Sequence, residues 1–282
     1  MADDFISSKE SEVAGKLAFK HQGIKKYWLH DSVFISSFFD SSSFLIPDTE
    51  RFIVKLVKRI APDISDEELR KKAELLIHEE SAHYSVHESY NTMLLREGYK
   101  IGFPMYINTA IFKFADKYFS NLTNMAITLT IEFFTLIVAK QFVPFLAAQI
   151  NVDERLKRLW MWHAIEEIEH SSISFDLFVY HKGGYIRRIA AFLFTTFVIF
   201  PLANISHLYL LSQNGGLFNF KVMSKGLKML LGRKGLYRTL LPEWLRFFKP
   251  SFHSSEITID PNIKRLLYHH HIEDELISYF SS

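Results

Sequence analysis

The stretch HEESAHYSVHESYN places one glutamate and two histidines in step along the chain. Glu80 and His83 are three residues apart, and His87 follows four residues after His83. In an α-helix these separations bring the three side chains to one face, because a helical turn takes about 3.6 residues. Carboxylate and imidazole groups on one face can hold a divalent metal ion together. The spacing therefore predicts that this helix carries half of a metal site.

A second stretch, WMWHAIEEIEH, carries a related pattern. His163, Glu167 and His170 are four and three residues apart, so they also share one helical face. The chain thus holds two Glu-x-x-His pairs on two separate helices. Glu166 can lie beside both histidines of its own helix, which makes it a rival ligand and the candidate general base.

Two further glutamates stand in helices where packing alone does not explain them. Glu132 is the only charged residue between Asn121 and Val138. A buried lone carboxylate is costly unless it is paired or bound to metal, so Glu132 is a candidate ligand. Glu50 lies in the first turn of its predicted helix, where it is either a ligand or a complement to the helix dipole.

The four helices that carry these residues follow the order Glu, Glu-x-x-His, Glu, Glu-x-x-His. This order is typical of di-metal carboxylate centres in four-helix bundles, where bridging carboxylates offset the repulsion between two cations. The chain has no cysteine, so oxygen and nitrogen ligands are expected, and we expect two ions, with iron favoured over manganese or zinc. The predicted ligands are Glu50, Glu80, His83, His87, Glu132, His163, Glu167 and His170.

Composition and periodicity predict an all-α protein. Hydrophobic residues make up 48% of the chain, and its 11 glycines and 8 prolines are few for a turn-rich β fold. We expect one domain over 1–282, with the metal-binding bundle over about 44–182 and an apolar helix and C-terminal extension over about 185–282. Helices are expected from about 47 to 60, 62 to 96, 105 to 118, 121 onward, 151 to 182, 185 onward and 260 to 280, after an irregular lead-in over 1–43.

Charge and hydropathy restrict the partners. A formal net charge of +2 gives no electrostatic basis for binding nucleic acid. The first residues are acidic and lack an apolar core, so no secretory signal is predicted and a cytoplasmic location is the default. The apolar segment 187–211 is interpreted first as a core helix, with membrane association or a true span as alternatives. A homodimer is left open, and the triple histidine 269–271 is interpreted as a chance cluster.

The segments FLIPDTERF, HEESAHYSVHESYN and WHAIEEIEHSSISFDLF together resemble a bacterial family described as predicted metal-dependent hydrolases, over roughly residues 30–240. The pattern His163-x-x-x-Glu167-x-x-His170 also resembles the arylamine N-oxygenase group of di-iron enzymes, which place an added histidine on one iron. A ferritin-like four-helix bundle core with additional C-terminal helices is then the expected fold. The family resemblance implies a site formed by Glu80, His83, His87, His163, Glu167 and His170.

Three functions compete. The ligand set and the aromatic-rich helices favour a di-iron oxygenase or oxidase that takes O2 and electrons from a donor and oxidises a small apolar substrate. The alternative is a metal-dependent hydrolase, in which a metal lowers the pKa of bound water and Glu166 acts as base. The third is a protein that binds metal without catalysis.

Overall fold

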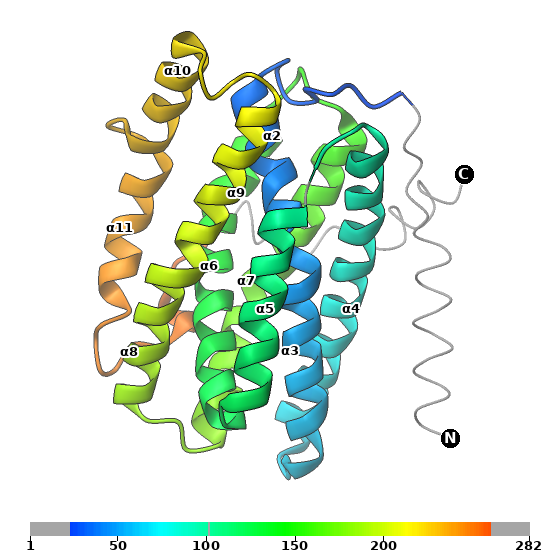
Figure 1. Cartoon of the computed structure of the whole chain (residues 1–282). Helices are drawn as coiled ribbons and strands as arrows, with labels where there is room; N and C mark the ends of the chain where they lie inside the picture. Colours follow the sequence, from blue (N-terminus) through cyan, green and yellow to red (C-terminus); the bar gives the residue numbers. More distant parts are fainter. Residues whose placement is uncertain (1–22, 101, 261–282) are drawn as a thin grey trace.

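The computed structural model describes residues 23–100 and 102–260 (Figure 1). Within these residues every regular element is a helix, and the one extended contact is an isolated antiparallel bridge between Leu29 and Val152. The predicted all-α class is therefore confirmed. The predicted last helix and the His269–His271 cluster fall outside the described residues.

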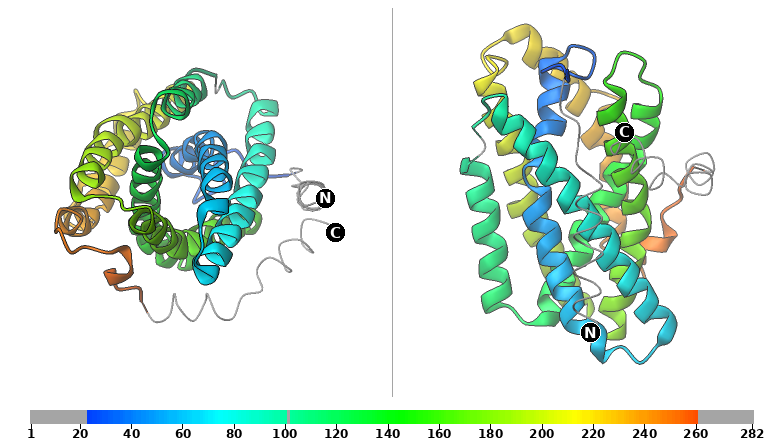
Figure 2. Two further views of the ribbon diagram at one scale, coloured as in Figure 1. Left: turned by 90° about the horizontal axis from the view of Figure 1, so that it is seen from below. Right: turned by 90° about the vertical axis from the view of Figure 1, so that its right-hand side faces the viewer.

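Four long helices form the centre of the fold. They are α3 (Ile46–Ile60), α4 (Glu67–Arg96), α6 (Asn121–Ala147) and α7 (Glu154–Tyr180). Helix α3 packs against α4 and α6, and α7 packs against the same two helices, so the four close into a ring that Figure 2 shows end-on. Each helix therefore turns one face toward a shared interior, and side chains from all four can meet there.

Side-chain caps define where three of the four long helices begin. The Asp66 carboxylate accepts a hydrogen bond from Leu69 N–H at the start of α4, and the Ser120 hydroxyl accepts from Thr123 N–H at the start of α6. Asp153 caps α7 in the same way, two residues after the predicted start of that helix at residue 151. These caps satisfy backbone donors that have no partner inside the helix, and they fix the register of the site residues.

The remaining helices lie outside this ring. In chain order they are α2 (Val33–Ser43), the short η1 (Ala61–Asp63), α5 (Gly102–Tyr118), α8 (Tyr185–Phe194), the π-helical turn η2 (Thr195–Ile199), α9 (Phe200–Gln213), α10 (Phe220–Leu231), α11 (Leu236–Arg246) and η3 (Ser254–Glu256). Helices α8, η2 and α9 continue one another along one side of the bundle, and α10 packs against α11 at its edge (Figure 1).

The irregular lead-in predicted for residues 1–43 is wrong for its last part, because Val33–Ser43 form α2. Serine-rich sequence lowers helix propensity, but here burial decides the outcome. The Asp40 carboxylate is buried and accepts hydrogen bonds from Trp28 Nε1–H and from the Tyr90 hydroxyl of α4. These contacts attach α2 to the end of the bundle.

The apolar segment 187–211 is not the core helix that the sequence favoured. Two helices are long and apolar enough to cross a membrane by length and composition, α6 and the continuous Tyr185–Gln213 helix. The most apolar window of α6 is 72% buried, whereas that of Tyr185–Gln213 is only 28% buried. Helix α6 is therefore the core helix, and Tyr185–Gln213 packs along the outside of the bundle.

Close packing of α10 on α2 gives a test of the fold. A Cβ atom on Gly226 would lie 2.1 Å from a ring carbon of Phe34, so a side chain there must displace a buried ring. We expect Gly226→Val to lower the free energy of unfolding by about 1–3 kcal/mol, the usual cost of overpacking. The exposed neighbour Ser224→Val is the control, and equal denaturation midpoints for the two variants would contradict this contact.

Candidate metal centre

The four ring helices bring all the predicted ligands into one interior. Glu50 comes from α3, Glu132 from α6, and the other six residues come from α4 and α7. Each of the eight side chains is buried, the most exposed being His163 at 6%. The eight are Glu50, Glu80, His83, His87, Glu132, His163, Glu167 and His170.

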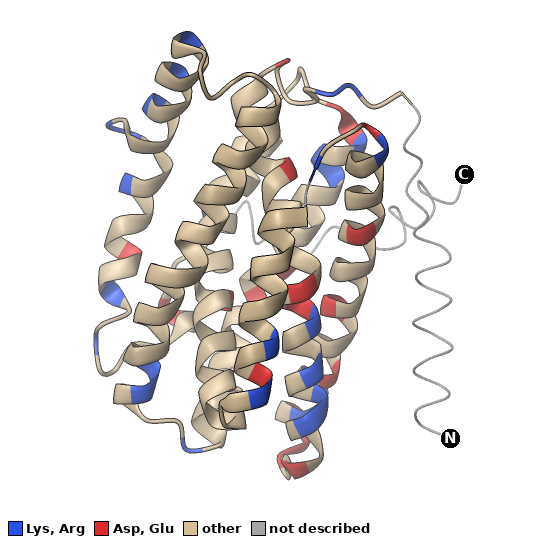
Figure 3. Ribbon diagram, viewed as in Figure 1, with Lys and Arg blue, Asp and Glu red and all other residues tan. Residues whose placement is uncertain are grey.

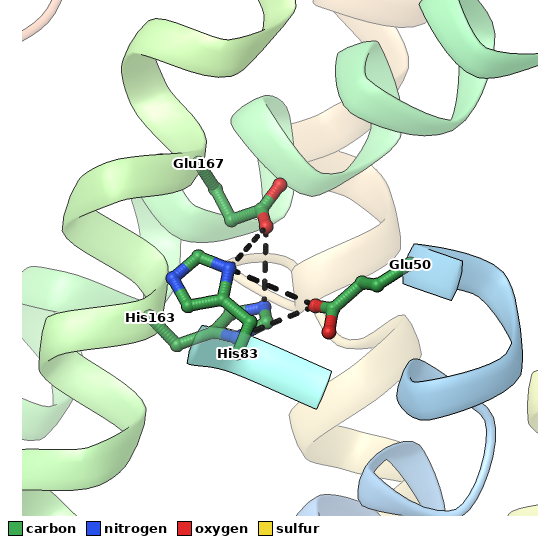
Figure 4. Close-up of side chains that lie close together, drawn as sticks. All are labelled: Glu50, His83, His163 and Glu167. Carbon is green, nitrogen blue, oxygen red and sulfur yellow. Dashed lines mark ion pairs between the residues drawn. The ribbon is translucent and has the colours of Figure 1, made fainter. Parts of the chain in front are cut away.

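One group of four residues joins three helices: Glu50, His83, His163 and Glu167 (Figure 4). Glu50 Oε1 lies 3.7 Å from His83 Nδ1 and 3.8 Å from His163 Nδ1. Glu167 Oε1 lies 3.5 Å from His83 Nδ1 and 3.4 Å from His163 Nε2. One donor atom from each of the four residues lies within 4.8 Å of the other three, as the ligands of one ion would.

A second group shares two of these residues and adds Glu80 and His170. His170 Nδ1 lies 2.9 Å from Glu80 Oε1 and 3.7 Å from Glu167 Oε1. Glu132 belongs to neither group, but its Oε2 is 4.0 Å from His170 Nδ1, on the edge of the second one. The carboxylate of Glu167 thus stands between the two groups, where a bridging ligand is needed.

The lone pairs in this interior lack hydrogen-bond partners among the described residues. The atoms concerned include Nδ1 of His83 and His163, Oε2 of Glu80 and both carboxylate oxygens of Glu132. Buried polar atoms are nearly always satisfied, so a cluster of exceptions needs a cause. Ligand atoms about 2.1 Å from one ion lie about 3.4 Å apart in tetrahedral geometry, close to most of the separations found here. A metal ion therefore fits the donor set.

Two further carboxylates hold the histidines from behind. Glu166 Oε2 lies 2.7 Å from His83 Nε2, and Glu79 Oε2 lies 2.8 Å from His170 Nε2. Each glutamate directly precedes a predicted ligand on its own helix and contacts a histidine of the opposite helix. Each carboxylate accepts a hydrogen bond from the Nε2–H of its histidine. This contact fixes the tautomer in which the Nδ1 lone pair is directed at the interior, and outer carboxylates orient metal-binding histidines in this way.

The contacts of Glu166 fit a residue that positions His83, and its general-base role stays a prediction. Its Oε2 accepts from His83 Nε2–H, and its Oε1 accepts from Trp162 Nε1–H at 2.7 Å. Both oxygens are thus engaged behind His83, on the side away from the interior. Two other glutamates near the ligands in the sequence do not face the interior. Glu88 pairs with Arg51, and Glu169 is exposed.

His87 lies beside the first group but outside both. The Ser43 hydroxyl donates its one proton to Asn91 Oδ1 at 2.8 Å, so at 2.9 Å it must accept from His87 Nδ1–H. This tautomer leaves the lone pair on Nε2, which is buried and unpartnered among the described residues. The ring lies 4.9 Å from that of His163 between centroids, so His87 stays a candidate ligand.

Burial and charge act together on the site pKa values. Burial, then the neighbouring carboxylates, raise the pKa of Glu50 and of Glu132 well above the usual value. Burial also opposes the charged form of Glu167, but the hydrogen bonds from His170 and His83 outweigh it and lower that pKa. Burial lowers the pKa of His83, yet its contacts with Glu166 and Glu167 raise it to about 10. These shifts favour protonation of Glu50, Glu132 and His83 when no cation is bound.

The charge of the interior indicates how many ions it needs. Glu50, Glu80, Glu132 and Glu167 carry four negative charges when all are ionised, and the imidazoles are neutral when they act as ligands. Two divalent ions would balance this charge, whereas one would leave two buried negative charges uncompensated.

A small cavity of about 80 Å³ reaches this interior between α3 and α6. Five of the predicted ligands line it, together with the apolar residues Leu45, Ile46, Ile53 and Ile131. Thr49 and Thr135 are the uncharged polar residues in the wall. The lining residues that the structure describes include no lysine or arginine.

Sequence reasoning missed the supporting residues. The sequence patterns point to no role for Trp162 and Ser43, although these residues position Glu166 and His87. A signal for Glu79 and Glu166 was available, because Glu-Glu-x-x-His occurs on both helices. The contact between Ser43 and His87 spans 44 residues, and no local spacing rule predicts it.

A helical bundle that encloses such a cluster of buried glutamates and histidines defines the class of carboxylate–histidine metal-binding proteins. Within that class, the chain belongs to the family described as predicted metal-dependent hydrolase, whose sequence model matches residues 14–258. The family resemblance expected from the motifs is thus confirmed. No curated protein and no solved structure matches the chain. The comparisons support the hydrolase alternative, and none of them supports the oxygenase interpretation.

Removing either outer carboxylate should weaken metal binding without removing a ligand. We expect Glu79→Gln and Glu166→Gln each to lower metal affinity about 10–100-fold. In each variant the histidine that donates to the altered residue loses its carboxylate acceptor. Glu169→Gln, an exposed glutamate on α7, is the matched control. Affinities measured by competition with a chromophoric chelator should separate the pair from the control, and three equal values would contradict the positioning role.

Metal affinity should rise with pH. Contacts with carboxylates outweigh burial and raise the pKa values of His83 and His170, so both rings hold protons at neutral pH without metal. Ions that bind at Nδ1 must displace these protons, and each displaced proton contributes about tenfold in affinity per pH unit. Titrations at about pH 6, 7 and 8 should show this slope together with proton release. A flat profile would rule out protonated ligands.

Proposed function

We propose that the protein is a metal-dependent hydrolase with two divalent ions in the bundle interior. The observation that carries this proposal is the cluster of unpartnered lone pairs at ligand spacing, with four carboxylates that need two divalent cations for balance. Membership of the family described as metal-dependent hydrolases supports the reaction class. Zinc, manganese and iron(II) all accept this set of oxygen and nitrogen donors.

The chain's own residues would divide the work. Glu50, His83 and His163 would hold one ion, Glu80, Glu132 and His170 the other, and Glu167 would bridge them. When bound, such ions supply Lewis acidity and lower the pKa of a bound water toward neutrality. Glu79 and Glu166 keep the Nδ1 lone pairs of two histidines aimed inward, and His87 Nε2 offers a further buried acceptor for a metal or a proton.

The cavity favours a substrate that presents a small, uncharged group to the ions. About 80 Å³ is the space of two or three water molecules, so a short group fits the cavity. Once two divalent ions balance the four carboxylates, no positive charge is left over for an anion, and no lysine or arginine is among the described lining residues. A neutral ester or amide with an apolar flank therefore suits the site better than a phosphate ester.

Metal reconstitution tests this function. Protein stripped with a chelator and reloaded anaerobically with zinc, manganese or iron(II) should bind two ions per chain. It should then hydrolyse p-nitrophenyl acetate faster than p-nitrophenyl phosphate. Glu132→Gln should lower the ion count below two per chain and the esterase rate at least tenfold. The reason is that the second ion loses a carboxylate at the edge of its group.

The exposed Glu74→Gln on α4 is the control, and it should leave both ion count and rate unchanged. Two irons whose optical bands respond to O2, with no hydrolysis of any ester tested, would replace the proposal by an oxygen-activating function. Fewer than one ion per chain would overturn the metal site itself.

A further inference from the structure

The segment that follows the metal-binding helices has an unusual charge distribution. Residues 177–242 contain nine lysines and arginines and no aspartate or glutamate. Within this segment, residues 189–220 carry no charge at all, so the basic residues flank a long apolar stretch on both sides. The segment forms α8, η2, α9 and α10 and most of α11, outside the ring of four helices. Figure 3 shows α9 without charged residues and α10 with several basic ones.

The Tyr185–Gln213 helix turns an apolar stripe to solvent. Ile186 is 84% exposed and Phe197 is 70% exposed, and Leu193, Ile205 and Leu208 continue the stripe at helical spacing. This side has no partner among the described residues, although the helix is apolar enough to cross a membrane by composition. Monomeric soluble proteins rarely expose a continuous row of large apolar side chains.

The opposite side of the same helix packs against the rest of the protein. The buried Arg188 guanidinium donates to the carbonyl oxygens of Phe252 and Lys249, and the Tyr237 hydroxyl donates to Asn204 Oδ1. His207 Nε2 lies 3.0 Å from the carbonyl oxygen of Phe34. These polar contacts hold one side of the helix against the bundle, so lipid cannot surround it and the helix cannot span a bilayer alone.

The turn between α9 and α10, with the first turn of α10, combines exposed apolar side chains with basic ones. Phe218 and Phe220 are 89% and 87% exposed, the most exposed phenylalanines in the described residues. Lys221, Lys225 and Lys228 follow on α10 and are exposed. Aromatic side chains beside several lysines are typical of segments that insert shallowly among lipid head groups.

We propose that the surface formed by the exposed side of α8–α9, the α9–α10 turn and α10 binds the surface of an anionic phospholipid bilayer. The apolar stripe and the two phenylalanines enter the interfacial region, and the exposed lysines and arginines that flank them contact lipid phosphates. Charge selects this partner over a second copy of the chain. An isologous dimer through this surface would bring two basic sets together with no acidic residue from 177–242 to balance them.

Vesicle sedimentation of the full-length, metal-loaded protein tests the proposal. Vesicles of phosphatidylcholine with about one third phosphatidylglycerol should bind the protein at least tenfold more tightly than pure phosphatidylcholine. Binding should weaken at high salt because the phosphate contacts are screened. The double variant Phe218→Ser/Phe220→Ser and the double variant Lys221→Glu/Lys225→Glu should each lower binding at least tenfold.

Two controls change similar residues on α4. Leu95 is 52% exposed and Lys71 is exposed, so Leu95→Ser and Lys71→Glu alter the same properties away from the proposed surface. Both controls should bind vesicles like the unaltered chain. The unaltered chain decides the matter even if a variant folds poorly, because failure to bind anionic vesicles overturns the proposal. Equal losses of vesicle binding in controls and variants also overturn it. So does a concentration-dependent dimer that the phenylalanine variant dissociates, if the unaltered chain does not bind vesicles.

Discussion

Placing four carboxylates in one buried space is the constraint on which the rest of this structure depends. Buried anions are strongly unfavourable unless cations or protons compensate them, and Glu50, Glu80, Glu132 and Glu167 lie within a single bundle interior. Without cations, protons would compensate this charge, because the pKa values of Glu50, Glu132 and His83 are all raised. The bundle therefore holds an interior whose electrostatic state depends on what occupies it.

The paired helices α4 and α7 meet this constraint with a reciprocal arrangement. Each carries a Glu-Glu-x-x-His sequence, and the first glutamate of each contacts the histidine of the other. Two hydrogen bonds thus join the helices on the outer side of the interior, where they also fix the histidine tautomers. The same residues that prepare the site for metal hold two of the four helices in register.

The sequence predicted the fold class and the set of residues that gather in the interior, because helical spacing is a local property. His83 and His170 could be placed on helix faces from the sequence alone, and Glu132 stood out as a lone charge in an apolar helix. Contacts between distant segments could not be predicted in this way. The helix at Val33–Ser43 forms because Asp40 and its neighbours are buried against α4, and Ser43 reaches His87 across 44 residues. Nor does apolar composition distinguish the buried α6 from the outer helix at Tyr185–Gln213, since only packing separates them.

His83 belongs to both four-residue groups, and this shared membership governs how the interior can fill. The nitrogen that faces inward has one lone pair, so it can serve one ion at a time. Once a first ion takes His83, the second must be completed by other donors, such as Glu132 at the edge of one group or His87 beside the other. The two positions are thus unequal by construction, and occupancy of one redefines the ligand set of the other.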